Sequence, residues 1–296
     1  MGTVLLHIGF AKCGSTFLQQ WFEKHPEIYF QPKRFAQGGF NAWEMARYAQ
    51  SNKEMPQNYL FSCEDFSIWQ GEPIIYGLAG SVHYDYRKFQ ENISAMLAGL
   101  FPAAKVLIVT RSHRQIIRSI YSQYIAKGGA FSLKEIFTVN PGMFQHFLNY
   151  NYVINLYRAK FGKENVIILP YEMLRDEPAK FIAAIESQLS ISGKFDFPNK
   201  QVNESFDKRI LNAYFKTSKF IYTALKPFPK RLQTWLYLQY MQQLRGNKPN
   251  EFIKLLATDN ELIYEGLDDF VQDLKPTAEI LRGEPVYQPY LNEYFD

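Results

Sequence analysis

The residues whose types and spacing best suit chemistry lie at positions 9–17, in the stretch GFAKCGSTF. Gly9 and Gly14 stand five residues apart, and the hydroxyl side chains of Ser15 and Thr16 follow the second glycine. Glycines let backbone N–H groups converge on a phosphate oxygen without obstruction by Cβ atoms, and hydroxyls in the first helical turn add donors. The stretch therefore predicts a phosphate-binding loop. The alternative is an ordinary turn between a strand and a helix, with Ser15 as the N-cap.

The lysine of this loop is not where a nucleoside-triphosphate loop has it. In the pattern G-x-x-x-x-G-K-[ST] the lysine follows the second glycine, whereas here Ser15 takes that place and Lys12 lies inside the loop. From that position the Lys12 ammonium can reach over a terminal anionic group of the ligand. The spacing thus favours a phosphate group other than the γ-phosphate of a nucleoside triphosphate.

A second anion site is predicted in the stretch VTRSHRQIIRSIYSQYIAKGG. Arg111 directly follows a continuous apolar run, at the sheet edge where α/β proteins bind ligands. Ser119 comes eight residues later on a predicted helix, together with Arg114 and Arg118, which are four residues apart and share a face. Arginines and a hydroxyl gathered at one strand end would bind a second phosphate through bidentate hydrogen bonds. For Arg114, a solvated basic helix face is the favoured alternative.

Alternating strands and helices must position these two stretches. Continuous apolar runs predict buried strands at 4–8, 58–66, 104–110 and 165–174. Helical periodicity is found at 16–24, 85–100, 115–127, 150–160 and 176–190, and loops are expected at 31–58, 71–86 and 128–147. The alternation predicts an α/β fold with a central parallel sheet and helices on both faces. We expect one domain over 1–296, with 206–296 as its helical C-terminal part, broken at Pro227 and Pro229.

Composition narrows the functional classes. The chain of 296 residues is 47% hydrophobic and 17% aromatic, which suffices for a sizeable core and a lined cleft. Its net charge of +4 is too small to indicate nucleic-acid binding. The two cysteines, Cys13 and Cys63, have neither metal-ligand spacing nor a disulfide framework. No signal peptide is recognisable, and no apolar run reaches the ~18 residues of a membrane span. We expect a cytoplasmic protein without a metal ion.

Together, the two stretches resemble the signature motifs of the sulfotransferases that use 3′-phosphoadenosine 5′-phosphosulfate (PAPS) as donor. AKCGSTF is similar to the family's P-K-S-G-T-T-W loop, which holds the 5′-phosphosulfate, and TRSHRQIIRSIYS is similar to its 3′-phosphate motif. YEML at 171–174 resembles the family's Y-E-D-L, and VNES at 202–205 is a further echo. The resemblance covers roughly residues 3–190 and is to bacterial and carbohydrate-modifying members. It implies transfer of a sulfuryl group, without a metal, to a hydroxyl or amine.

At the 5′ end of the donor, the resemblance implies a role for each loop residue. Lys12 would contact the bridging oxygen and the sulfuryl group, while Gly14, Ser15 and Thr16 would cradle the 5′-phosphate. Cys13 is also in the loop, but it stands where the family has a serine, so one strong hydroxyl donor is lost.

At the other end of the donor, the resemblance assigns the 3′-phosphate to Arg111 and Ser119. Phe17 stands where the family often has a tryptophan stacked on adenine, and a phenyl ring can also stack. Tyr171 either reaches the adenine or is a core tyrosine.

A general base is still needed to take the proton of the acceptor. Glu64 is the first candidate because it follows a predicted strand, and carbohydrate-modifying members of the family use a glutamate at a similar position. The alternative is that Glu64 caps a helix or pairs with a basic residue. His83, just before a predicted helix, is the next candidate as base or substrate contact. His7 is expected to be packed in the first strand, and His113 to assist the 3′-phosphate or to cap a helix.

The acceptor is predicted only as a class, a glycan or a polar small molecule held by the three loops and the C-terminal helices. The basic and aromatic stretch 215–246 is a lid or packing layer, or alternatively a helix for a membrane surface or a partner. Two other functions stay open. One is a kinase with an altered loop, against which the missing lysine after Gly14 counts. The other is a non-catalytic nucleotide-binding module.

Overall fold

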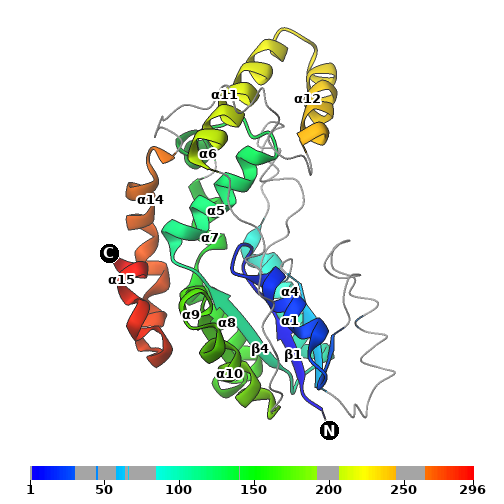
Figure 1. The fold of residues 1–296 in the computed structure, drawn as a ribbon, viewed down its shortest axis with the longest axis vertical. Coiled ribbons are helices and arrows are strands. Elements are labelled where there is room, and N and C mark those ends of the chain that lie inside the picture. Colours follow the sequence, from blue (N-terminus) through cyan, green and yellow to red (C-terminus); the bar gives the residue numbers. More distant parts are fainter. Residues whose placement is uncertain are drawn as a thin grey trace.

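A five-stranded parallel sheet forms the centre of the fold (Figure 1). The computed structural model describes residues 2–30, 45, 58–63, 66, 85–139, 141–191, 207–244 and 264–296. The strands are β1 Val4–His7, β2 Ile28–Phe30, β3 Asn58–Ser62, β4 Lys105–Thr110 and β5 Val166–Pro170. Their spatial order is β2-β3-β1-β4-β5, with Leu5 of β1 paired to Leu60 of β3 and to Lys105 of β4. The predicted α/β fold with a parallel sheet is confirmed.

Helices connect and extend this sheet. They are α1 Ser15–Lys24, α4 Tyr86–Leu100, α5 His113–Ala126, α6 Leu133–Val139, α7 Pro141–Phe147, α8 Tyr150–Phe161, α9 Tyr171–Asp176, α10 Pro178–Leu189, α11 Lys208–Leu225, α12 Lys230–Leu244, α14 Leu267–Leu274 and α15 Leu291–Phe295, with short 3₁₀ helices η2 Lys163–Asn165, η4 Lys275–Gly283 and η5 Pro285–Tyr290. Several of these helices have an N-capping side chain. Asp85 accepts from the Lys88 N–H at the start of α4, and Asn149 accepts from the Tyr152 N–H at the start of α8.

The strand order explains which helices cover which face. From β1 to β2 the chain moves two positions along the sheet, and from β3 to β4 it moves two positions in the opposite direction. Because both crossovers are between parallel strands and such connections are right-handed, α1 and α4 lie on opposite faces. Helix α1 packs on β2 and β3, whereas α4 packs on α8, which in turn covers β4 and β5.

The core combines aliphatic side chains with many aromatic ones. Trp21 of α1, Tyr121 of α5, Tyr157 of α8 and Phe181 of α10 are fully buried. Strand β4 is buried from Val106 to the end, as a strand with neighbours on both sides and helices on its faces should be. Within the described residues, aromatic side chains thus contribute a substantial part of the interior.

The structure differs from the sequence prediction at five places. The strand predicted at 58–66 ends at Ser62. The short edge strand β2 was not predicted, because three residues carry too little periodicity. The predicted loop at 128–147 contains α6 and α7. The predicted strand at 165–174 ends at Pro170, and 171–176 is helical. The helix predicted to begin at 176 begins instead at Pro178, which suits the first turn because it needs no N–H partner there.

The C-terminal part is helical as predicted, within the residues the structure describes, and it divides into two pieces. Helices α11 and α12 form a hairpin at the top of Figure 1, whereas the segment from α14 to α15 runs down one side of the sheet domain. In that segment η4 packs on α8, and η5 packs on β5. Residues far apart in sequence are thereby brought to the carboxyl ends of β4 and β5.

Candidate active site

The glycine loop between β1 and α1 has two residues in the left-handed backbone region. Lys12 has φ 69° and Gly14 has φ 83°. This conformation is uncommon for a non-glycine residue such as Lys12. Alternation of left-handed and right-handed residues turns successive N–H groups toward one side, which forms an anion-binding concavity. No side chain among the described residues caps the start of α1, so this helix end also offers backbone donors to a ligand.

Gly14 is fixed by its surroundings as well as by its φ angle. A Cβ atom on Gly14 would lie 2.7 Å from Leu174 Cδ2 and 3.3 Å from the ring of Tyr171. The loop therefore packs directly against the start of α9, and only glycine fits there.

The side chains of the loop point in different directions. Ser15 is buried, and its hydroxyl has no hydrogen-bond partner in the described part of the chain. Thr16 is exposed and Phe17 is half-buried against the core. The Cys13 side chain is fully buried among core residues and does not face a ligand. The Cys13 N–H donates to the Phe10 carbonyl at 3.3 Å.

Arg111 lies beside this loop, at the end of β4. Its Nη1 donates to the Lys12 carbonyl at 3.0 Å, and its Nε and Nη2 donate to Gln115 Oε1, each at 3.3 Å. The guanidinium carbon lies 4.3 Å from the centre of the Tyr171 ring, a cation–π distance. All these partners are neutral, so the positive charge of Arg111 is positioned by the protein without being neutralised by them.

This arrangement lies where parallel sheets bind ligands. β1 is followed by a connection toward one edge of the sheet and β4 lies on its other side, so the gap between their carboxyl ends is the switch point of the strand order. Three predicted site residues meet there from three strands: Lys12 after β1, Arg111 after β4 and Tyr171 after β5. Ser119 lies further along α5, half-buried, and within the described residues it makes no hydrogen bond with Arg111.

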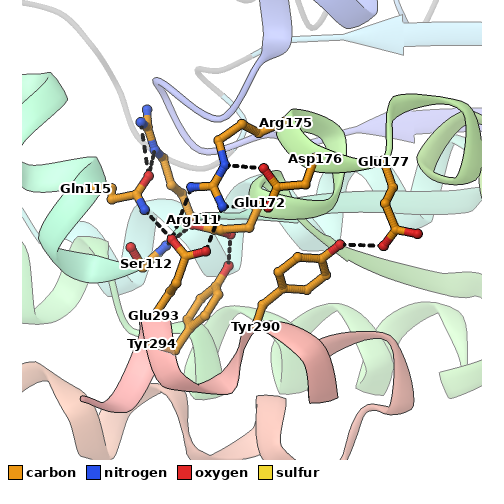
Figure 2. Close-up of polar contacts among 10 residues, drawn as sticks. All are labelled: Arg111, Ser112, Gln115, Glu172, Arg175, Asp176, Glu177, Tyr290, Glu293 and Tyr294. Carbon is orange, nitrogen blue, oxygen red and sulfur yellow. Dashed lines mark hydrogen bonds and ion pairs between the residues drawn. The ribbon is translucent and has the colours of Figure 1, made fainter.

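A buried carboxylate supports the strand end that carries Arg111 (Figure 2). Glu172 Oε1 accepts from the Ser112 N–H at 3.0 Å, and Oε2 accepts from the Tyr294 hydroxyl at 2.9 Å. Burial raises the pKa of Glu172, while the bonds from Ser112 and Tyr294 act in the lowering direction. Thr110 Oγ1 is also bonded to the Tyr294 hydroxyl, at 2.9 Å. The C-terminal segment thus satisfies the polar groups behind Arg111.

An outer layer of charges joins the same elements. Figure 2 shows Glu293 of α15 between Gln115 and Arg175, accepting from both, with Arg175 also paired to Asp176 at 2.6 Å. Gln115 therefore connects Glu293 to the guanidinium of Arg111. This role of Gln115 was not predicted from the sequence, although Gln115 comes four residues after Arg111, which is the spacing of a side-chain pair.

A model of the sulfotransferase family matches residues 5–196 of the chain. The chain belongs to the sulfotransferase family. The matched range includes the glycine loop, Arg111 and Tyr171, so the family resemblance of the two motifs is confirmed.

Solved sulfotransferase structures also resemble this family member. A sulfotransferase from Alicyclobacillus acidocaldarius is 16% identical with a TM-score of 0.46, covering 74% of this chain and 93% of that one. Mouse sulfotransferase SULT7A1, solved in complex with PAP, is 13% identical with a TM-score of 0.43, covering 95% of this chain and 87% of that one. Comparison with curated protein sequences gives no match.

Two histidines of this sulfotransferase are buried near the site. His7 Nδ1 is bonded to Ser62 Oγ at 2.7 Å, and Gln19 Nε2 donates to the same oxygen at 3.2 Å. The opposite nitrogen, Nε2, would lie 2.6 Å from a Cβ on Gly9, so His7 lies directly under the loop. Burial lowers the pKa of His7 to about 4, and the ring is neutral at pH 7. His7 is packed, as predicted from the sequence.

His113 differs from its predicted role. Its Nε2 donates to the Leu148 carbonyl at 3.0 Å, and its ring stacks on Tyr150 with centroids 4.8 Å apart. Burial lowers the pKa of His113 to about 4. The side chain therefore faces the interior, not an anion at the sheet edge, because the first turn of α5 turns it toward α7 and α8.

The two candidate bases of the sequence analysis, Glu64 and His83, lie outside the described residues, and VNES at 202–205 does too. Cys63, the residue before Glu64, is described: it is buried, and its N–H donates to the His7 carbonyl at 3.2 Å. In the part of the chain that is described, no group of three or more His, Cys, Asp or Glu residues could hold a metal ion. None of the described helices is long and apolar enough to cross a membrane.

Proposed function

We propose that this sulfotransferase moves the sulfuryl group of PAPS to a hydroxyl or amine of a glycan or polar small molecule. The observation that supports the proposal is the pairing of two candidate anion sites across the switch point. They are a left-handed loop at a helix start and, 3.0 Å from its Lys12 carbonyl, the guanidinium of Arg111. PAPS has two anionic ends, whereas a nucleoside triphosphate has one.

The donor would lie across this edge with its 5′-phosphosulfate on the loop. Backbone N–H groups of the loop and the hydroxyls of Ser15 and Thr16 would bind the 5′-phosphate, and the unpartnered, buried Ser15 hydroxyl supports this assignment. Arg111, with Ser119 further along α5, would bind the 3′-phosphate. Tyr171 already lies under the Arg111 guanidinium, so its ring would border the nucleoside.

The transfer is an in-line displacement at sulfur. The acceptor oxygen or nitrogen forms a bond to sulfur as the bond from sulfur to the bridging phosphate oxygen breaks, and 3′-phosphoadenosine 5′-phosphate (PAP) leaves. Negative charge grows on that bridging oxygen, and the Lys12 ammonium with the loop N–H groups would stabilise it. The acceptor proton passes to a base, for which Glu64 is our first candidate and His83 the second.

Incubation with ³⁵S-labelled PAPS and a panel of glycans and polar hydroxyl compounds tests the proposal. We expect label on at least one acceptor, undiminished by EDTA, and thermal protection of the protein by PAP. Protection by ATP only in the presence of Mg²⁺, with no response to PAP, would contradict it and favour a kinase. Protection by PAP with no labelled acceptor would favour a non-catalytic binding module.

The base is tested separately. Glu64→Gln should lower kcat while leaving the KM for PAPS unchanged, because the amide cannot take a proton but the donor site is intact. Normal turnover in this variant would move the assignment to His83, and His83→Gln is then the variant to assay.

A further inference from the structure

The hairpin of α11 and α12 carries most of the bulky apolar surface of the described residues. Among all described residues, five large hydrophobic side chains are exposed, and four of them, with exposed fractions of 41–73%, belong to this hairpin. They are Phe220, Phe228, Leu232 and Trp235. Single exposed apolar side chains are ordinary, but a gathering on one projecting element marks an interaction surface.

The charge of the hairpin is as unusual as its apolar surface. Residues 208–244 contain seven Lys and Arg and no Asp or Glu, whereas the whole chain has a net charge of only +4. Lys226, Lys230 and Arg231 flank Phe228 at the turn between the two helices. Arg209 and Lys219 are paired with Asp207 and Glu135, so the positive charge that a partner would meet beside the apolar side chains is that at the turn, and the partner must offer negative charge beside an apolar layer.

The exposed side chains occupy a defined face. Phe228, Leu232 and Trp235 follow one another at intervals of four and three residues, which places them on one side of α12 and its entry. On the other side of α12, Tyr237 and Met241 are buried against Ala130. Helix α12 thus has apolar side chains both on the face that packs against the protein and on the exposed face, where solvent would favour polar residues.

The hairpin is firmly attached to the rest of the fold. The Tyr237 hydroxyl donates to the Gly128 carbonyl at 2.6 Å, just beyond the end of α5, and Ser218 of α11 is bonded to the Tyr240 hydroxyl of α12 at 2.9 Å. Helix α11 also packs along α5. In Figure 1 its turn is the part of the molecule farthest from the sheet. The outer face is therefore presented in a fixed orientation.

We propose that this hairpin docks on an anionic lipid bilayer. Phe228, Leu232 and Trp235 would enter the boundary between headgroups and acyl chains, and the flanking Lys and Arg side chains would contact anionic headgroups. The complete lack of acidic residues in 208–244 fits a uniformly negative surface better than a protein surface of mixed charge. The docked helices lie on the membrane and do not span it.

Vesicle flotation with the full chain tests the docking, without PAPS, so that its outcome is independent of the proposed transfer. The probes are phosphatidylcholine vesicles with and without 30% phosphatidylserine. We expect binding only to the anionic vesicles, weakened by salt. Because each basic residue near such a surface contributes about fivefold in affinity, Lys226→Glu with Lys230→Glu should weaken binding by at least about 25-fold.

A matched control changes the same charge elsewhere. Lys160→Glu with Lys163→Glu alters two exposed lysines near the end of α8, and its binding should equal that of the native chain. Leu232→Ser with Trp235→Ser should abolish vesicle binding. Because both side chains are exposed, this variant should keep the unfolding temperature and circular dichroism spectrum of the native chain.

Three results would overturn the proposal. The first is equally weakened vesicle binding in the hairpin charge variant and in the matched control near the end of α8, which would show that only the net charge of the chain matters. The second is absence of vesicle binding together with a concentration-dependent dimer that Leu232→Ser with Trp235→Ser abolishes, which would show that a second copy covers this face. The third is absence of vesicle binding together with salt-dependent binding to a single-stranded oligonucleotide.

Discussion

Replacement of Arg111 by glutamine gives the sharpest test of the donor site. The guanidinium has five N–H donors, and three of them are engaged, one with the Lys12 carbonyl and two with Gln115. Two N–H donors therefore remain for an anion, the number that a bidentate contact with a phosphate requires. Hydrogen bonds to a charged group contribute about 1.5–3 kcal/mol. We expect Arg111→Gln to weaken PAP binding by roughly 10- to 150-fold.

The assay compares two ligands by calorimetric titration. PAP has the 3′-phosphate and 5′-AMP lacks it, while both have the 5′-phosphate that the loop would bind. The native protein should prefer PAP, and Arg111→Gln should lose most of that preference while keeping its affinity for 5′-AMP. Arg114→Gln is the control, because Arg114 lies only three residues further along, in the first turn of α5, and is paired with Asp268 on the exposed side. The preference of this variant for PAP should not change.

Equal weakening of both ligands by Arg111→Gln would refute this reasoning. Arg111 would then act only by holding the Lys12 carbonyl, and thus the shape of the loop. An unchanged preference for PAP would mean that the 3′-phosphate binds elsewhere. Ser119 would then lose its assignment to the 3′-phosphate too, because that assignment depends on its spacing from Arg111.

Three further predictions concern the loop and the buried histidines. Lys12→Ala should lower kcat about 100-fold yet shift the unfolding temperature little, as measured by sulfate transfer and thermal melts; a normal kcat would contradict the role of Lys12. Gly14→Ala should cost about 1–3 kcal/mol in urea unfolding, because Cβ meets α9 and φ is positive; full stability would mean that the loop is free to shift. His7 and His113 have pKa values lowered to about 4 in the folded state. Each neutral ring therefore contributes about 3 kcal/mol to the free energy of unfolding above a pH of about 6.5, the pKa of histidine in the unfolded chain. This contribution is lost as the pH falls to about 4, where the rings become protonated in the folded state. His7→Gln should flatten this pH dependence in urea unfolding, and an unchanged dependence would show that other groups cause it.

The sheet, the glycine loop and the position of Arg111 could be predicted because their signals are local. A buried parallel strand such as β4 is an uninterrupted apolar run, and the residue after it, Arg111, must lie at the ligand edge. The glycine loop is recognisable because its backbone conformation demands glycine at position 14. These inferences need only the chain within a few residues of the feature.

The support behind the site could not be predicted, because it depends on contacts between distant residues. Glu172 continues an apolar strand run in sequence, and only its bonds to Ser112 and Tyr294 show it as a buried polar contact. The burial of Cys13 has the same origin, since the loop conformation decides which side chains face the core. Helices α6 and α7 are seven residues each, too short for a clear periodicity.

The packing of the C-terminal segment against the ends of β4 and β5 has a consequence for the order of folding. All five strands lie before residue 171, but Thr110 and Glu172 find their hydroxyl partners only on Tyr287 and Tyr294. During synthesis, a chain that already contains the complete sheet therefore still has polar groups at its ligand edge that await residues more than 100 positions away. Contacts of such long range close late and slowly. The proposed anion site should consequently be the last part of the sheet domain to become rigid, and ligand binding should report the completion of folding.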